Sequence, residues 1–332
     1  MNRQSILVTR EIFPEVLDKL RTHFSVEANQ EDVAWSLEQI CERAKGKAGL
    51  LTSGGERIDA GLLEQCPDLK IVANTAVGFN NFDLDAMTAC GVLGTNAPDV
   101  LTETTADFGF ALLMATARRI GESEQYIRAG KWSRGRIDFF AGSDVHGSTL
   151  GILGMGRIGQ AIAKRGAHGF GMKVLYNNRS QLESHLEQAC SASFVSKEKL
   201  LREADHLVLV LPYSAQAHHC IGEAELSLMK PTANLINIAR GGVVDDAALA
   251  HALREKKIAA AGLDVFEGEP SVHPDLLAVP NIVLTPHIAS ATIRTRKAMA
   301  HLAADNLIGY LVQGKPLTPL NPQVLQRCSG ND

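Results

Sequence analysis

The stretch "TLGILGMGRIG", residues 149–159, decides the fold class of this chain. A short apolar run leads into the pattern G-x-G-x-x-G, and a helical pattern begins at Arg157. Gly154 permits a tight turn, Gly156 lets the backbone approach a pyrophosphate, and Gly159 lets the helix pack close to the strand. The helix N-terminus offers unpaired N–H groups to phosphate oxygens. The stretch therefore predicts a dinucleotide-binding turn. A plain glycine turn is the alternative, and the flanking strand and helix patterns disfavour it.

Strand-like and helix-like runs alternate on both sides of this turn. Before it, "ILVT", "AGLLTS" and "KIVANTA" each precede a helical pattern, and Pro14 is expected in the first turn of one such helix. After it come the short apolar runs "KVLYNN", "HLVLVLP", "NLINIA", "AAGLDV" and "NIVLTP". Continuous apolar strands are typical of parallel sheets buried on both faces. For 332 residues we predict an α/β protein of two Rossmann-like, doubly wound parallel-sheet domains with a cleft between them.

Four further segments have patterns of their own. Residues 102–120 form an almost continuously apolar helical run, and residues 291–315 form a second long one. Residues 121–147 are irregular, aromatic and rich in glycine, so we interpret them as an arm rather than a core element. The tail "PLTPLNPQVLQ", residues 316–326, is predicted to be extended because its prolines restrict the backbone.

The composition is that of an ordinary globular protein, and it narrows the possible partners. The formal charge is −4 and no segment is strongly basic, so nucleic acid is not an expected partner. The N-terminus "MNRQSILVTR" has too short an apolar run for a signal peptide. No uninterrupted apolar stretch is long enough to cross a bilayer. We therefore expect a cytoplasmic protein with no membrane partner.

Cysteine and histidine spacing predicts neither a disulfide framework nor a metal site. The six cysteines form no C-x-x-C pair and are interpreted as reduced, mostly buried thiols; they stand at positions 41, 66, 90, 190, 220 and 328. The histidines form no H-E-x-x-H pattern. His218 and His219 are adjacent, so we expect their side chains to point in different directions on a helix or a strand.

The stretch "KVLYNNRS", residues 173–180, indicates which nicotinamide cofactor the turn accepts. The end of this second strand normally carries an acid that binds the free ribose 2′-hydroxyl. Here Asn177 is uncharged, and Asn178 follows it. Arg179 can form a forked contact with a phosphate, and Ser180 can donate one more hydrogen bond. The stretch therefore predicts a 2′-phosphate site and a preference for NADPH over NADH, with a solvated polar turn as the alternative.

Residues that suit hydride-transfer chemistry follow three other predicted strands. Arg240 follows "NLINIA", Asp264 and Glu269 lie in "AGLDVFEGEP", and His287 follows "NIVLTP". In a parallel sheet these segments reach the same edge as the glycine-rich turn. A guanidinium binds a carboxylate, an imidazole transfers a proton, and a neighbouring carboxylate orients the imidazole. Each residue alone is compatible with an ordinary loop position, but the combination favours a catalytic site.

The motifs "LGILGMGRIG", "INIARGG", "GLDVFEGEP" and "TPHIAS" resemble those of the D-isomer-specific 2-hydroxyacid dehydrogenase family over nearly the whole chain. Within the family, the sequence is most similar to the bacterial glyoxylate/hydroxypyruvate reductases that also reduce 2-ketogluconate. The resemblance implies a discontinuous substrate domain, residues 1–100 plus 287–332, and an NADP-binding Rossmann domain, residues 101–286.

The resemblance also implies roles for individual residues. Arg240 would bind the substrate carboxylate and carbonyl, His287 would donate the proton, and Glu269 would be its partner. The remaining substrate contacts would be Val77 and Gly78, through their N–H groups, together with Ser290. Asp264 would face the nicotinamide amide, and the other cofactor contacts would be Gly154, Met155, Gly156, Arg157, Ile158, Gly159, Asn177, Asn178, Arg179, Ser180, Leu211, Pro212, Ile238, Ala239, Arg240 and Ala289.

The implied activity is NADPH-dependent reduction of glyoxylate, hydroxypyruvate or 2-keto-D-gluconate to the D-2-hydroxy acid. The implied assembly is a homodimer formed through residues 121–147, with Phe139 or Phe140 reaching into the neighbour's cleft. An NAD-dependent D-lactate-type dehydrogenase is an alternative that Asn177 and Arg179 disfavour. A nucleotide-sensing, corepressor-like binding protein on the same fold is the second alternative.

Overall fold

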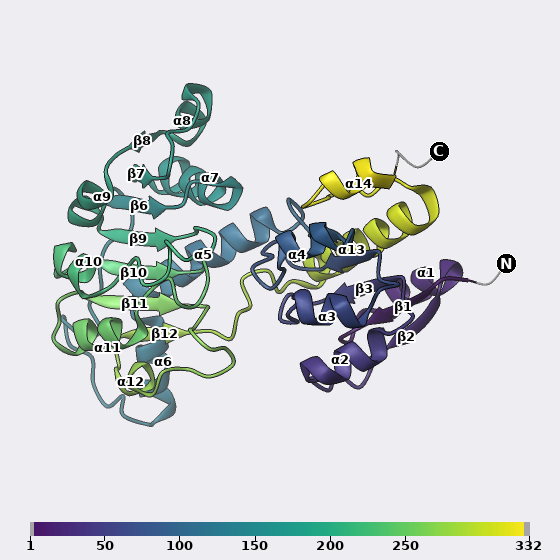
Figure 1. Ribbon diagram of the computed structural model, residues 1–332. Helices are drawn as coiled ribbons and strands as arrows, with labels where there is room; N and C mark the ends of the chain where they lie inside the picture. Colours follow the sequence, from purple (N-terminus) through teal and green to yellow (C-terminus); the bar gives the residue numbers. More distant parts are fainter. Residues whose placement is uncertain (1–2, 329–332) are drawn as a thin grey trace. The chain divides into compact units, whose positions relative to one another are not determined.

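The computed structural model describes residues 3–328 and contains two compact units. Unit 1 comprises the chain up to Leu101 and again from Ala291, and unit 2 comprises Thr102–Ser290. Each unit is built on one parallel β-sheet with helices on both faces (Figure 1). The predicted α/β class, with two domains built on parallel sheets, is therefore confirmed.

Unit 1 has a five-stranded sheet in the order β2-β1-β3-β4-β5. Its strands are β1 (Ser5–Val8), β2 (Ser25–Ala28), β3 (Gly49–Thr52), β4 (Ile71–Asn74) and β5 (Leu93–Thr95). Its helices are α1 (Pro14–His23), α2 (Leu37–Ala44), α3 (Ala60–Gln65), α4 (Leu84–Ala89), α13 (Ile293–Gln313) and α14 (Gln323–Cys328).

Side-chain alternation along β1 divides the core of unit 1 into two layers. Ile6 and Val8 are buried in a cluster with apolar residues of α1 and α13. Leu7 points to the other face and is buried in a cluster with residues of α2, α3 and α4. Pro14 occupies the first turn of α1, as predicted, where its missing N–H leaves no helical hydrogen bond unmade.

Unit 2 has a seven-stranded sheet in the order β12-β11-β10-β9-β6-β7-β8. Its strands are β6 (Thr149–Leu153), β7 (Lys173–Asn177), β8 (Ala192–Phe194), β9 (His206–Leu209), β10 (Asn234–Asn237), β11 (Ala260–Leu263) and β12 (Ile282–Leu284). Its helices are α5 (Thr102–Ala117), α6 (Ile120–Arg128), α7 (Arg157–Lys164), the π-helical turn η1 (Arg165–Gly169), α8 (Ser184–Cys190), α9 (Lys197–Glu203), α10 (Glu223–Leu228), α11 (Asp246–Arg254) and α12 (Pro274–Ala278).

The strand order of unit 2 creates a switch point beside the glycine-rich turn. Chain connections run outward from β6 in both directions, first through β7 and then through β9. Ile152, Val208 and Ile236 are buried against α5 and α7 on one face. Leu207 and Leu235 are buried against α9, α10 and α11 on the other. Ligands bind beyond the carboxyl ends of the strands at such a switch point, which is where the loops after β6, β9 and β10 meet.

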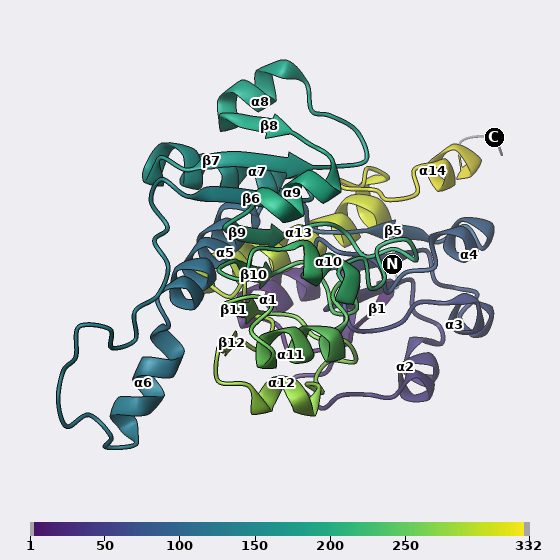
Figure 2. The same cartoon turned by 90° about the vertical axis from the view of Figure 1, so that its left-hand side faces the viewer.

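Two expectations from the sequence are wrong in detail. The apolar run at 102–120 is interrupted, because α5 ends at Ala117 and Arg119 adopts a left-handed φ of 54°. The arm 121–147 is not wholly irregular, because most of α6 lies within it (Figure 2). No residue of α6 is buried, so this helix adds nothing to the core of unit 2.

The tail, residues 316–326, also ends differently from the prediction, because α14 begins at Gln323. Pro322 directly precedes this helix, where a proline leaves no hydrogen bond unmade. No helix among residues 3–328 is both long enough and apolar enough to cross a membrane.

Candidate active site

The glycine-rich turn after β6 needs its glycines for three different reasons. Gly154 has φ +103°, and a Cβ there would lie 2.6 Å from the backbone nitrogen of Leu211. A Cβ at Gly159 would lie 2.4 Å from the carbonyl oxygen of Gly154. A Cβ at Gly156 would meet nothing within 4 Å, and no side chain caps the helix that begins at Arg157. The turn is thus tight inside and open at Gly156, which fits a pyrophosphate against the N-terminus of α7.

The two asparagines after β7 take different positions. The amide nitrogen of Asn177 donates a hydrogen bond of 2.8 Å to the carbonyl oxygen of Val195. The side-chain oxygen of Asn178 accepts a hydrogen bond of 2.7 Å from the backbone N–H of Met155, inside the glycine-rich turn. Consecutive residues of an extended chain point to opposite sides, so only one of the two can face the turn. Asn178 therefore faces the glycine-rich turn, and Asn177 points away from it.

The two residues that follow are open to solvent. Arg179 and Ser180 are both exposed. Arg179 forms no hydrogen bond or ion pair with any other residue in the part of the chain that the structure describes, which leaves its guanidinium available to an anion.

His287 and Glu269 form a direct pair. The Nδ1 atom of His287 lies 2.7 Å from Oε2 of Glu269, and Oε1 of Glu269 accepts a hydrogen bond of 2.9 Å from the N–H of Phe266. Burial raises the pKa of Glu269, but the hydrogen bonds from His287 and Phe266 and the nearby positive charges outweigh burial and lower it overall. Glu269 is therefore ionised at neutral pH. Its carboxylate contacts Nδ1 of His287, so the Nε2 atom of the imidazole is directed away from Glu269.

Asp264 holds the segment that carries His287. Its side chain is completely buried at the end of β11, and Oδ1 accepts hydrogen bonds from the hydroxyl of Thr285 at 2.7 Å and from the N–H of Ile288 at 2.9 Å. Its other oxygen, Oδ2, accepts from the N–H of Ala289 at 2.8 Å. His287 itself adopts a left-handed φ of 54°. The buried carboxylate thus fixes an unusual backbone conformation at the histidine.

Arg240 follows β10 in a turn that another side chain organises. The side-chain oxygen of Asn237 accepts from the N–H of Ala239 at 3.0 Å, and its amide nitrogen donates to the carbonyl oxygen of Arg240 at 3.3 Å. The Nη1 atom of Arg240 donates to the carbonyl oxygen of Ala239 at 2.6 Å. Burial lowers the pKa of Arg240, and the charge of Glu269 opposes that change. The guanidinium therefore lies near Glu269, as expected for one site.

A small cavity of about 280 Å³ adjoins the His287–Glu269 pair. Its other walls are mostly apolar and include Phe266, Val272, Leu277 and Leu284. An apolar wall strengthens the electrostatic interaction between the imidazole and the carboxylate.

The remaining predicted site residues divide between the two units. All of the following belong to unit 2: Leu211 and Pro212 in the loop after β9, Ile238 and Ala239 directly after β10, and Ser290 after Ala289. Val77 and Gly78 follow β4 and belong to unit 1. Their carbonyl oxygens accept hydrogen bonds from Asn96 and Asn74, respectively.

Sequence reasoning missed three residues that shape the site. Asn237 and Thr285 position Arg240 and Asp264 through hydrogen bonds, and Phe266 contributes an N–H group to Glu269. A polar residue at the last position of an apolar strand was the available signal for Asn237.

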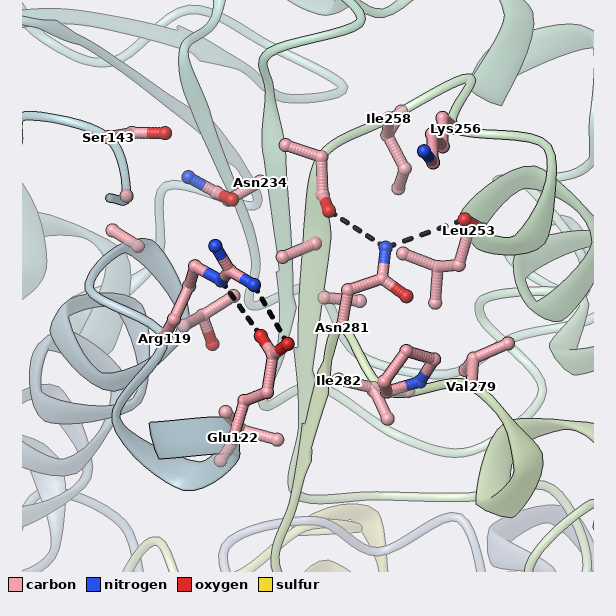
Figure 3. A pocket seen from close by; sticks show the side chains of 18 of the residues that line it. Arg119, Glu122, Ser143, Asn234, Leu253, Lys256, Ile258, Val279, Asn281 and Ile282 are labelled. Carbon is pink, nitrogen blue, oxygen red and sulfur yellow. Dashed lines mark hydrogen bonds and ion pairs between the residues drawn. The ribbon is translucent and has the colours of Figure 1, made fainter. Parts of the chain in front are cut away.

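Sequence reasoning also missed a pocket of about 610 Å³ at the opposite, amino-terminal edge of the unit 2 sheet (Figure 3). Apolar residues such as Leu253, Ile258 and Val279 line it, and the Arg119–Glu122 ion pair lies at one side, at the root of the arm. The pocket is remote from the glycine-rich turn, because the turn follows the carboxyl end of β6 in a fully parallel sheet.

Comparison with known proteins identifies the family of this chain. The family model for the NAD-binding domain of D-isomer specific 2-hydroxyacid dehydrogenases matches residues 110–289. Glyoxylate reductase from Thermococcus onnurineus is 47% identical over 327 residues, covering 97% of each chain. The solved NADPH-dependent glyoxylate/hydroxypyruvate reductase from Sinorhizobium meliloti, in complex with NADP and malonate, has a TM-score of 0.84 and 35% identity, covering 96% of this chain and 97% of its own. This chain therefore belongs to the D-isomer specific 2-hydroxyacid dehydrogenase family.

Proposed function

We propose that this protein reduces a small 2-oxo acid to the D-2-hydroxy acid with a nicotinamide dinucleotide as cofactor. The observation that carries the proposal is the pairing of His287 with an ionised Glu269 in the same unit as Arg240 and an open glycine-rich turn. An acid–base residue, an anion-binding guanidinium and a dinucleotide cradle are the parts that such a reduction requires.

Each residue of the proposed site has one task. Arg240 binds the substrate carboxylate and stabilises the carbonyl oxygen as negative charge develops on it. His287 delivers a proton from Nε2 to that oxygen, and Glu269 stabilises the imidazolium form. Asp264 acts as a positioning residue, because its carboxylate holds the backbone after His287. The bound nicotinamide would supply the hydride. Val77 and Gly78 of unit 1 are proposed to bind the substrate carboxylate through their N–H groups.

We propose NADPH as the preferred cofactor. Position 178, which faces the glycine-rich turn, is an asparagine and not an acid. The exposed side chains of Arg179 and Ser180 can both bind a 2′-phosphate. The similar reductase from Sinorhizobium meliloti, which is NADPH-dependent and was solved with NADP, supports this choice. An acid at this position would repel the 2′-phosphate, so its absence also disfavours the NAD-dependent alternative.

Glyoxylate is the first substrate to test, because the relatives from Thermococcus and Pyrococcus are glyoxylate reductases. Hydroxypyruvate and 2-keto-D-gluconate are the further candidates. Steady-state kinetics over a panel of 2-oxo acids, each with NADPH and NADH, tests the activity and the cofactor preference together. A protein that binds NADPH but turns over no 2-oxo acid would instead support the corepressor-like alternative.

We also propose that the protein is a homodimer assembled through the arm. The arm exposes Ile127, Trp132 and Ile137, which is costly for a surface without a partner. The apolar pocket of Figure 3 lies at the root of the same arm. Phe139 and Phe140 pack edge-on against Tyr126 within their own chain, so the arm carries a small aromatic core that stiffens it.

A further inference from the structure

Three potential metal ligands meet outside the proposed active site. One ligand atom each from His218, His219 and Glu267 lies within 4.8 Å of the other two. The imidazole rings of the two histidines stack with their centroids 3.9 Å apart and an interplanar angle of 20°. The expectation that adjacent histidines point in different directions is therefore wrong, and with it the argument that excluded a metal site here.

The backbone explains why the two rings lie side by side. His218 and His219 stand in neither a helix nor a strand but in the loop after β9. His219 adopts a left-handed φ of 49°, which turns its side chain to the same side as that of His218. A hydrogen bond of 2.7 Å from the N–H of His219 to the carbonyl oxygen of Gly242 holds this conformation. The strained backbone thus brings together two side chains that a regular element would separate.

A polar group lies near the Nδ1 atom of each histidine, at hydrogen-bond distance only for His218. The hydroxyl of Tyr213 lies 3.1 Å from Nδ1 of His218, so this contact leaves Nε2 of His218 for a ligand. Nδ1 of His219 lies 3.9 Å from Oδ2 of Asp245, while its Nε2 lies 2.8 Å from Oε2 of Glu267. Metal-binding histidines characteristically have a carboxylate or another polar group at the ring nitrogen that does not bind the metal.

A glycine lies beside the cluster, where a side chain would crowd it. Gly242 has φ +75°, and a Cβ there would lie 3.2 Å from the ring of Tyr213, 3.3 Å from Nδ1 of His218 and 3.7 Å from Cδ of Glu267. His218 and Glu267 are exposed, so an ion can enter from solvent. A side chain at position 242 would crowd all three groups, whereas glycine leaves them room to move.

We propose that His218, His219 and Glu267 form a binding site for one zinc-like divalent metal ion. Two imidazole nitrogens and one carboxylate oxygen suit Zn²⁺, Co²⁺ or Ni²⁺ and suit Mg²⁺ or Ca²⁺ poorly. Ligand atoms that each lie about 2.0–2.2 Å from a tetrahedral ion are roughly 3.3–3.5 Å apart. For an ion to be accepted, the His219–Glu267 contact of 2.8 Å must lengthen, and the stacked rings must turn from their near-parallel arrangement until the plane of each ring points at the ion.

The bound ion would tie two loops of unit 2 together. The histidines stand in the loop after β9, and Glu267 stands in the loop after β11, two residues before Glu269. A metal bridge between these loops restrains the segment that presents Glu269 without touching the residues of the proposed chemistry. The site is thus a structural or regulatory one, and its existence does not depend on the proposed function.

Isothermal titration of the untagged, chelator-treated protein with Zn²⁺, and absorption spectra with Co²⁺, test the proposal. The native chain should bind one equivalent, and Co²⁺ should give visible bands typical of nitrogen and oxygen ligands. His219→Asn keeps a residue that tolerates a left-handed φ and should abolish this binding. His218→Gln and Glu267→Gln should weaken it. Tyr213→Phe should lower the affinity by roughly tenfold, the usual effect of losing an outer partner.

Two matched controls make the result decisive. His185, an exposed histidine that also lies beside a glutamate, should be replaceable by asparagine without loss of binding. Cys220, the neighbour of His219 in the sequence, should be replaceable by serine without loss, since no thiolate band is expected. The absence of stoichiometric binding to the native chain overturns the proposal. Binding that survives His219→Asn, or that disappears in Cys220→Ser, overturns it equally.

Discussion

The Nδ1 atom of His287 lies 2.7 Å from the Oε2 atom of Glu269, although the two residues belong to loops that follow different strands. The contact exists because each loop is fixed separately. Phe266 donates its N–H to Glu269, and buried Asp264 accepts the N–H groups that follow His287. The pair is therefore preorganised, and a preorganised acid loses little free energy to reorientation during the reaction.

The first prediction concerns the work of this pair in proton transfer. His287 delivers the proton to the carbonyl oxygen, and Glu269 orients its imidazole. His287→Ala should lower kcat by roughly a hundredfold or more, because a positioned acid is lost. Glu269→Gln keeps a hydrogen-bonding side chain but removes the charge, so it should lower kcat with little change in KM. Steady-state kinetics with glyoxylate measure both variants. An unchanged kcat in Glu269→Gln would show that the two residues do not act together.

The second prediction concerns Arg240. Arg240→Ala should raise KM and lower kcat together, with kcat/KM falling by roughly a hundredfold or more, because the guanidinium binds both the carboxylate and the developing oxyanion. Arg240→Lys should restore only part of the activity, since a point charge cannot replace the planar fork. Steady-state kinetics with glyoxylate measure both. Near-native kinetics in Arg240→Ala would remove this residue from the site.

The third prediction concerns the cofactor. A charged hydrogen bond contributes roughly 1.5–3 kcal/mol, so Arg179→Ala should lower the preference for NADPH by about tenfold to a hundredfold. Adding Asn178→Asp should reverse the preference, because this position faces the glycine-rich turn. Asn177→Asp is the matched control and should change the preference little, since its side chain contacts Val195. Equal affinity of the native protein for NADH and NADPH would contradict the proposed 2′-phosphate site.

The fourth prediction concerns assembly. Removal of the loop 130–140 from the arm deletes the exposed side chains of Trp132 and Ile137 and should convert dimers into monomers. The double substitution Trp132→Ser and Ile137→Ser removes the same apolar surface without shortening the chain and should weaken the dimer. Light scattering at micromolar concentration measures the mass. A monomeric native protein would refute the dimer.

The fifth prediction concerns His206, which is completely buried in β9. Its ring lies 3.1 Å from the carbonyl oxygen of Asp144 and 3.0 Å from the amide of Asn234, and burial lowers its pKa below the ordinary value of 6.5. At pH values below about 6.5, His206 therefore binds a proton in the unfolded chain more readily than in the folded chain. The free energy of unfolding should therefore decrease as the pH falls below about 6.5.

Denaturant unfolding at neutral and mildly acidic pH checks this effect. His206→Ala should cost roughly 1–3 kcal/mol at neutral pH, because it leaves buried polar groups unsatisfied. His206→Ala should also reduce the dependence of the free energy of unfolding on pH. Replacement of the exposed His185 by alanine should change neither the free energy of unfolding nor its dependence on pH. An unchanged pH dependence in His206→Ala would show that other groups cause it.

Local features of the sequence determined the fold class. Gly154 and Gly159 are required by backbone geometry within a few residues of the turn, and the apolar runs are buried on both faces by a parallel sheet. These properties depend on φ angles and on side-chain periodicity, which neighbouring residues decide. The same reasoning placed Arg240, Asp264, Glu269 and His287 at one edge of the sheet, because parallel strands end there.

Only the tertiary structure decided which side chains meet. The sequence could not show that Asn178 rather than Asn177 faces the turn, since this depends on how the chain leaves β7. It could not show that the rings of His218 and His219 stack, because a hydrogen bond to Gly242 from a distant loop holds His219 at a left-handed φ. Contacts between loops depend on long-range packing, which overrides the local preferences that a sequence pattern records.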